Sequence, residues 1–187
     1  MHNSVKEEIN LLSKTMTILL GIIQEKPVNA YELTKLLSKL NVKSWYNIAD
    51  STVYATIKSA EKKEYIVGCI EKSGNMPDKT VYSITEKGSQ ELLDTIESFI
   101  CNFDYDITPF SIAVFFIRIL GKDRSIILLE KRRDLLKKYE DGIKKQVENM
   151  KEQGVNEVFI GNTIQSLYIV EAQIKGVDTL IPKIKSM

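Results

Sequence analysis

The sequence has few of the residues that most catalytic and metal chemistry requires. Its only histidine is His2, and its two cysteines, Cys69 and Cys101, form no CxxC pair. We therefore expect no metal site and no cofactor, and we interpret the cysteines as ordinary thiols of a reducing compartment, with paired or redox-sensing thiols as the alternative. Glycine-rich phosphate loops and Ser/His/Asp or Cys/His sets are also missing, so the protein is predicted not to be an enzyme.

Long apolar runs and an excess of one charge are missing too. The most apolar stretch, residues 110–120, is too short to cross a bilayer, which takes about 20 residues. Residues 1–10 do not resemble a signal peptide, so we expect a cytoplasmic protein without membrane contact. The formal net charge is only +1, so a basic face for nucleic acid would have to be created by folding.

The first third of the chain has the apolar period of helices. A first amphipathic helix is predicted to end near Gln24, before Pro27. Asn29 followed by Glu32 resembles a capping box and opens a second helix, which Asn41 closes. The apolar positions of the first helix are Ile9, Leu12, Met16, Leu19, Leu20 and Ile23.

A third helix is expected to begin at a cap formed by Asp50 or Ser51. Its inner positions are predicted to be Val53, Tyr54, Ile57 and Ala60. Its outer face would show Ser51, Thr52, Ala55, Lys58, Ser59 and Lys62.

The period then changes from helical to alternating. Residues 66–71 and 80–84 are typical of two strands joined by a loop of turn-forming residues, and Thr85 is expected to cap a fourth helix. Three helices followed by a two-stranded wing form a winged helix-turn-helix. A small all-helical bundle is the alternative, and the change of period counts against it.

The second half is predicted to be helical. Thr108 and Pro109 are expected at the N-cap and first position of a helix that Gly121 ends, and Asp123 is expected to cap the next helix, which reaches about residue 151. Pro182 is expected to end the last helix. The predicted fold class is mainly α with a small β-hairpin, with domains at 1–102 and 103–187.

A heptad repeat runs along the long helix of the second half. An apolar stripe of this kind can pack against a second copy of the chain or against the last helix of the same chain, and we expect both contacts to form. The predicted dimerisation residues are Leu129, Leu136, Ile143 and Met150.

Four segments in series, residues 20–23, 29–33, 50–54 and 79–88, closely resemble the PadR family of transcriptional regulators. The sequence departs from the family at Ala49, where a small hydroxyl residue is usual, and at Glu64 and Tyr65, where Gly and Leu are common. Ala60 replaces a usual Leu. The resemblance implies a homodimer that binds double-stranded DNA.

The third helix is the expected recognition helix, with Ser51 and Thr52 at the end that meets base edges in the major groove. Tyr54 has two interpretations: a hydroxyl that approaches the DNA backbone, as the family resemblance implies, or a core ring with an exposed tip. The full set of predicted DNA contacts is Ser51, Thr52, Tyr54, Lys58, Lys72, Lys79 and Thr80.

These expectations lead to a sequence-specific regulator, a repressor, that binds a palindromic operator as a homodimer. The alternative is a winged-helix protein-interaction module that does not bind DNA. A small-molecule effector of unidentified chemistry is left open. Five aromatic side chains of the second half either line its pocket or, as favoured here, belong to the core: Phe115, Phe116, Tyr139, Phe159 and Tyr168.

Overall fold

The computed structural model describes residues 11–40, 42–73 and 76–186, without the side chains of residues 44, 72, 73 and 76–78. The chain divides into two compact units, Met1–Ser98 and Phe99–Met187. The predicted fold class is confirmed, since the described residues are mainly helical with a small antiparallel sheet. The predicted roles of Ile9 and Asn41 lie outside the described residues.

The first two helices of the N-terminal unit begin at side-chain caps. In α1 (Lys14–Glu25), the Ser13 hydroxyl accepts a hydrogen bond from the Met16 amide at 3.2 Å. In α2 (Ala30–Lys39), Asn29 Oδ1 accepts from the Glu32 amide at 2.9 Å, which confirms the predicted cap. Each bond satisfies an amide that the helix itself leaves unpaired.

The third helix, α3 (Asp50–Lys62), begins without a side-chain cap, after the short 3-10 helix η1 (Val42–Ser44). Its N-cap is Ala49, so the prediction that Asp50 or Ser51 caps it was wrong. Asp50 is instead the first helical residue, where its negative charge interacts favourably with the helix dipole. On the inner side Val53, Ile57 and Ala60 are buried, and α3 packs against α1 and α2.

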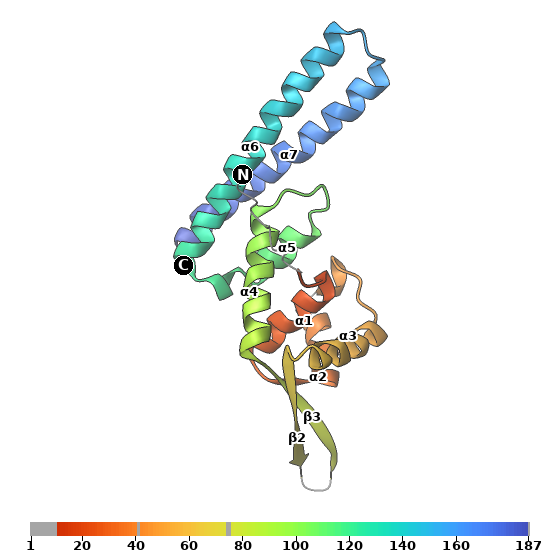
Figure 1. Cartoon of the computed structure of the whole chain (residues 1–187), viewed down its shortest axis with the longest axis vertical. Coiled ribbons are helices and arrows are strands. Elements are labelled where there is room, and N and C mark those ends of the chain that lie inside the picture. Colours follow the sequence, from red (N-terminus) through yellow and green to blue (C-terminus); the bar gives the residue numbers. More distant parts are fainter. Residues whose placement is uncertain (1–10, 41, 74–75, 187) are drawn as a thin grey trace, which may run out of the picture. The chain divides into compact units, whose positions relative to one another are not determined.

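The sheet of the N-terminal unit is antiparallel, with strand order β1-β3-β2. Strands β2 (Ile66–Ser73) and β3 (Met76–Ile84) form the long hairpin that extends from the helices in Figure 1. Strand β1 (Val28–Asn29) pairs with β3 through the Val28–Tyr82 register. Strand β1 could not be predicted from the sequence, because a two-residue strand is too short to show an alternating period.

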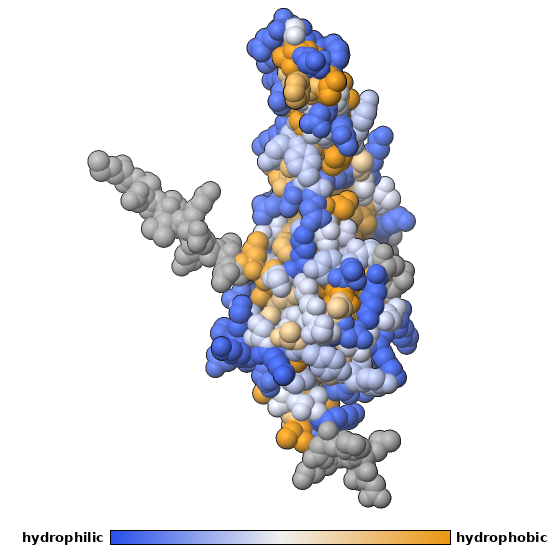
Figure 2. Space-filling model, turned by 90° about the vertical axis from the view of Figure 1, so that its right-hand side faces the viewer, coloured by the Kyte–Doolittle hydropathy of each residue, from blue (hydrophilic) through white to orange (hydrophobic). Residues whose placement is uncertain are grey.

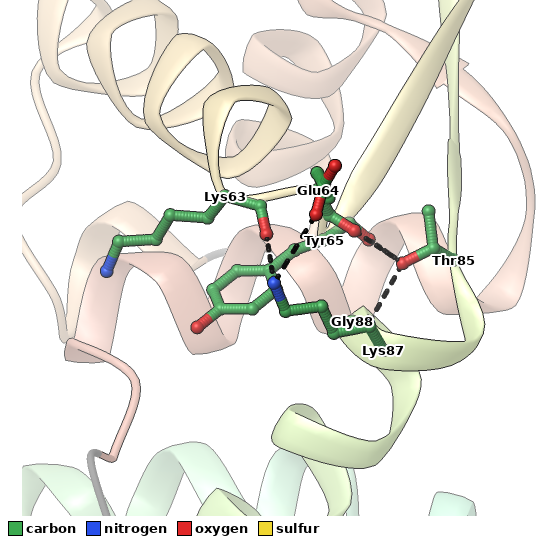
Figure 3. Close-up of polar contacts among 6 residues, drawn as sticks. All are labelled: Lys63, Glu64, Tyr65, Thr85, Lys87 and Gly88. Atoms are coloured by element: carbon green, nitrogen blue, oxygen red, sulfur yellow. Dashed lines mark hydrogen bonds and ion pairs between the residues drawn. The ribbon is translucent and has the colours of Figure 1, made fainter.

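A network of polar contacts joins the hairpin to α4 (Glu86–Cys101), as Figure 3 shows. Thr85 Oγ1 accepts from the Gly88 amide at 3.0 Å and donates to the Glu64 carbonyl at 2.7 Å, in agreement with the predicted cap at Thr85. Lys87 Nζ donates to the Lys63 carbonyl at 2.9 Å and lies 3.7 Å from a Glu64 carboxylate oxygen. These contacts fix where the hairpin leaves and re-enters the helical core.

Two backbone positions in this network have narrow requirements. Glu64 has φ of 62°, a left-handed conformation that favours glycine, the residue common there in the family that the sequence resembles. Gly88 lies against the backbone of Tyr65, and a Cβ added to it would be 2.1 Å from the Tyr65 carbonyl oxygen. Only glycine therefore fits at position 88 without movement of the chain.

The short helix α5 (Thr108–Phe115) of the C-terminal unit starts one residue earlier than predicted. Its N-cap is Ile107, so Thr108 is the first helical residue and not the cap, and Pro109 is the second. The 3-10 helix η2 (Ile117–Leu120) follows, so the predicted helix over 110–120 is divided.

Two long antiparallel helices, α6 (Lys122–Glu152) and α7 (Glu157–Lys185), make up most of the C-terminal unit and lie side by side in Figure 1. The N-cap of α6 is Gly121, not Asp123, which lies within the first turn. Pro182 does not end α7, which continues to Lys185. A proline in the last turn leaves only a few helical residues after it, so the bend that it causes displaces little of the helix.

Arg132 of α6 connects several segments of the C-terminal unit from a buried position. Its guanidinium donates to the carbonyls of Ile100 and Asn102 at 3.1 and 2.6 Å and to Gln173 Oε1 at 2.5 Å. The same group lies 4.0 Å from the centre of the Phe110 ring. Arg132 is only 1% exposed, and this burial lowers its pKa to about 10.

The five aromatic residues of the second half are mostly not in the core. Only Phe116 is buried, whereas Phe115, Tyr139, Phe159 and Tyr168 are exposed, so the favoured core interpretation was wrong for these four. Val158 and Phe159, at the start of α7, are also exposed. Figure 2 shows apolar surface at the end of the unit where α6 and α7 are joined. No helix of the described residues is long and apolar enough to cross a membrane.

Candidate nucleic-acid interface

The outward face of α3 presents polar and basic side chains. Ser51 and Thr52, in its first turn, are exposed, and so is Lys58 two turns further along. Lys58 makes no ion pair with any described residue, so its charge is available to an external anion. The N-terminal end of α3 therefore combines hydroxyl groups with the positive end of the helix dipole.

Tyr54, expected among the inner positions of α3, is 45% exposed, so its ring is not buried in the core. Its side chain instead lines an open groove of about 590 Å³ between α2, α3 and β3. The groove is lined by Asn29, Ala30, Tyr31, Glu32, Tyr54, Lys79, Thr80 and Tyr82. It thus brings together three of the predicted contact residues: Tyr54, Lys79 and Thr80.

The groove also contains functional groups that the sequence analysis did not select. Tyr31 is 60% exposed, and Lys35 Nζ lies 4.3 Å from the centre of its ring. Tyr82 of β3 lines the same groove, and its pKa is raised by burial and, second, by the charge of Glu61. Tyr31 lies two residues after the cap at Asn29, in the first turn of α2. Its place at a helix start and within the 29–33 segment of family resemblance were the available sequence signals.

Lys79 is held between two carboxylates. Its Nζ lies 3.4 Å from Glu71 Oε2 across the hairpin and 4.0 Å from Glu32 Oε1 on α2. All three side chains are about half exposed, so the ion pairs are screened by water. The side chain of the remaining wing lysine, Lys72, lies outside the described part of the structure.

A second ion pair lies at the start of α3. Lys43 Nζ, on η1, donates to Asp50 Oδ1 at 2.8 Å, and the two side chains are 36% and 62% exposed. This pair could not be predicted from the sequence, because the loop that brings the two residues together has no regular period.

The four predicted dimerisation residues lie on α6 and are covered to a large extent in the single chain. Leu129 and Leu136 have no exposed surface, and Ile143 is also buried. Met150 is half-buried and its sulfur accepts a hydrogen bond from Thr163 Oγ1 of α7 at 3.5 Å. Most of their surface is therefore covered by other residues of the same chain.

The C-terminal unit contains a cavity of about 290 Å³ at the start of α6. It is lined by Ile117, Arg118, Gly121, Lys122, Ser125 and Ile184, and none of the five aromatic residues contributes to it. In the described parts of the chain, no group of three or more His, Cys, Asp or Glu side chains could hold a metal ion.

The N-terminal unit has three packed helices, of which the third has an exposed N-terminal end, followed by a two-stranded wing. This arrangement is a winged helix-turn-helix. In this class of fold the second helix of the motif enters the major groove of DNA. The family model described as the Transcriptional regulator PadR-like family matches residues 19–94, from within α1 to within α4, and so includes α2, α3 and the hairpin. Within this segment the chain is therefore similar to the PadR-like family of transcriptional regulators.

Solved structures that match parts or most of the chain include PadR and PadR-like regulators from two Bacillus species. Bacillus subtilis PadR in complex with operator DNA is 16% identical, with a TM-score of 0.43, over 90% of this chain and 98% of that one. The same protein in complex with p-coumaric acid is 14% identical, with a TM-score of 0.38, over 92% and 99%. A PadR-like regulator from Bacillus cereus is 28% identical, with a TM-score of 0.36, over 42% and 74%. The search of curated proteins found no match.

Proposed function

We propose that this transcriptional regulator binds a palindromic operator as a homodimer and represses transcription from it. The observation that carries the proposal is the exposed N-terminal end of α3, with Ser51 and Thr52, beside a groove that contains Lys79. We assign DNA binding to the N-terminal unit and dimerisation to the C-terminal unit. A dimer bound over a promoter would act by excluding RNA polymerase.

The two parts of the interface have different tasks. Ser51 and Thr52 would meet base edges, because hydroxyl groups donate or accept and the threonine methyl can touch a thymine methyl. The groove would receive the phosphate backbone through the hydroxyls of Tyr31 and Tyr54 and the ammonium of Lys79. Lys58, Lys72 and Thr80 would add backbone contacts, which position the protein without specifying sequence.

The dimer contact would use the exposed apolar side chains of α6 and α7. Ile127, Tyr139, Val158, Phe159 and Tyr168 are all more than 40% exposed in the single chain. The heptad residues Leu129, Leu136, Ile143 and Met150 would contribute indirectly, because they hold the two helices in the arrangement that presents this surface. Two copies double the phosphate contacts and impose two-fold symmetry on the operator, with half-sites about one helical turn apart or a multiple of it.

Selection of bound duplexes from a random DNA pool tests the proposal most completely. The expected result is a palindromic consensus with two equal half-sites. Sedimentation of the protein alone and with the selected duplex would give the number of chains bound. A single unsymmetrical half-site, or a monomer on the DNA, would contradict the dimer.

A fluorescence anisotropy titration at two salt concentrations separates this function from a protein-interaction module. Affinity for DNA should fall steeply as salt rises, because each neutralised phosphate releases condensed counterions. Absence of binding at both salt concentrations would support the protein-interaction module instead.

A further inference from the structure

The ion pair at the start of α3 has spare hydrogen-bonding capacity on its exposed side. Asp50 uses Oδ1 to accept from Lys43 Nζ, and its other oxygen, Oδ2, has no hydrogen-bond partner in the described residues. An ammonium has three donors, and Lys43 uses one of them on Asp50. Among the described residues, one acceptor of Asp50 and two donors of Lys43 therefore have no hydrogen-bond partner, and they lie next to each other at the start of α3.

A carboxylate at this place needs an explanation, because it adds negative charge to a surface proposed to approach a polyanion. Stabilisation of the helix dipole accounts for an acidic residue at the first helical position, and an exposed ion pair contributes only about 0–1 kcal/mol to folding. Neither effect requires the partner to be a lysine from η1. Lys43 and Asp50 together, however, form a pair without net charge, which can enter the major groove without net repulsion.

The two groups match the edge of one base pair. A carboxylate only accepts hydrogen bonds, so in the major groove it pairs with the N4 amino group of cytosine or the N6 amino group of adenine and disfavours guanine and thymine. An ammonium only donates, so it pairs with O6 and N7 of guanine. A C·G base pair presents the cytosine amino group and the guanine acceptors side by side.

We propose that the Lys43–Asp50 pair reads one C·G base pair in each half-site, with Asp50 accepting from N4 of cytosine and Lys43 donating to O6 or N7 of guanine. This inference rests on the proposed function, because it requires the N-terminal end of α3 to lie in the major groove. In a palindromic operator the C·G pair would occur twice, related by the two-fold axis.

The test is selection from a random pool with the wild-type protein and the variants Asp50→Asn and Lys43→Gln. Asn pairs with adenine through N6 and N7, so Asp50→Asn should change the preference at one position of each half-site from cytosine towards adenine. Lys43→Gln should weaken the guanine preference at the same base pair. In competition titrations, discrimination at this position should fall by about tenfold or more.

Asp123→Asn is the matched control, because Asp123 is an acidic residue in the first turn of a helix of the C-terminal unit. Its selected consensus should equal that of the wild type. Far-UV circular dichroism of each variant confirms folding, and either of the two interface variants alone decides the outcome if the other does not fold.

The inference would be overturned if the folded variants select the wild-type consensus, or if they lose affinity equally for every sequence, as expected of a purely structural ion pair. If the wild-type protein selects no sequence, the proposed function itself fails. A wild-type consensus that the two variants leave unchanged overturns only the reading of C·G by this pair.

Discussion

Substitution of Gly88 by alanine tests how α4 supports the wing. A Cβ at this position would be 2.1 Å from the Tyr65 carbonyl oxygen, 2.8 Å from its carbonyl carbon and 3.0 Å from Ile84 Cγ1. The first distance requires a movement of about 1 Å before an ordinary contact is reached. Because Tyr65 also accepts from the Thr85 amide at 3.0 Å, such a movement would displace the hairpin from the end of α4.

The magnitude follows from two opposing effects. Alanine favours a helix over glycine by about 1 kcal/mol, whereas forcing atoms into a packed site costs about 1–3 kcal/mol and occasionally more. A clash with backbone, which cannot rotate away, belongs at the upper end of that range. We therefore expect Gly88→Ala to lower the free energy of unfolding of the N-terminal unit by about 1–2 kcal/mol after the gain in helix propensity is subtracted.

Urea unfolding followed by tryptophan fluorescence measures this change, because the only tryptophan, Trp45, lies in the N-terminal unit. The midpoint should fall by roughly 0.5–1 M at the urea dependence usual for small domains. Gly142→Ala is the matched control, since Gly142 lies within α6 and a Cβ there would meet nothing within 4 Å. That variant should stabilise the C-terminal unit by about 0.5–1 kcal/mol, seen by circular dichroism. An unchanged or higher midpoint for Gly88→Ala would refute the reasoning.

Three further predictions concern charge and burial. Glu71→Gln removes the nearer of the two carboxylates beside Lys79 and should tighten DNA binding by about two- to fivefold at low salt, with a steeper salt dependence; weaker binding in an anisotropy titration would contradict the assignment of Lys79. Arg132→Met should destabilise the C-terminal unit by about 2–4 kcal/mol in denaturant unfolding, because it leaves buried carbonyls unpaired; an unchanged midpoint would contradict this. The pKa of Tyr65 is raised by burial and, second, by Glu91, so the unfolded phenol ionises first and stability should fall as pH rises above 10. Tyr65→Phe should reduce this loss of stability at high pH, and phenolate absorbance should show that the ionisation of highest pKa is lost from the folded protein. A variant whose stability depends on pH as the wild type does would contradict this prediction.

The elements that could be predicted from the sequence are those set by local chemistry. The caps at Asn29 and Thr85 depend on a side chain and an amide three residues apart, so the sequence shows both partners. The outward position of Ser51 and Thr52 follows from the helical period of the buried residues on the other side of α3.

The features that could not be predicted depend on partners distant in the chain. Strand β1 forms because β3 offers it an edge, and two residues carry no period of their own. Ala49 begins α3 without a side-chain cap, because the loop conformation before it sets the start of the helix. The exposure of Phe159 also could not be predicted. An apolar residue on a helix indicates that it is buried, but the sequence does not show whether the same chain or another chain covers it.

The central claim is that the hydroxyl-bearing end of α3 distinguishes DNA sequences. The most direct measurement is the ratio of affinities for a selected operator and a shuffled duplex, for the wild type and for the double variant Ser51→Ala, Thr52→Ala. Ser59→Ala, at the other end of the same helix, is the control. We predict that the ratio falls at least tenfold in the double variant while affinity for the shuffled duplex is retained. An unchanged ratio would contradict the claim.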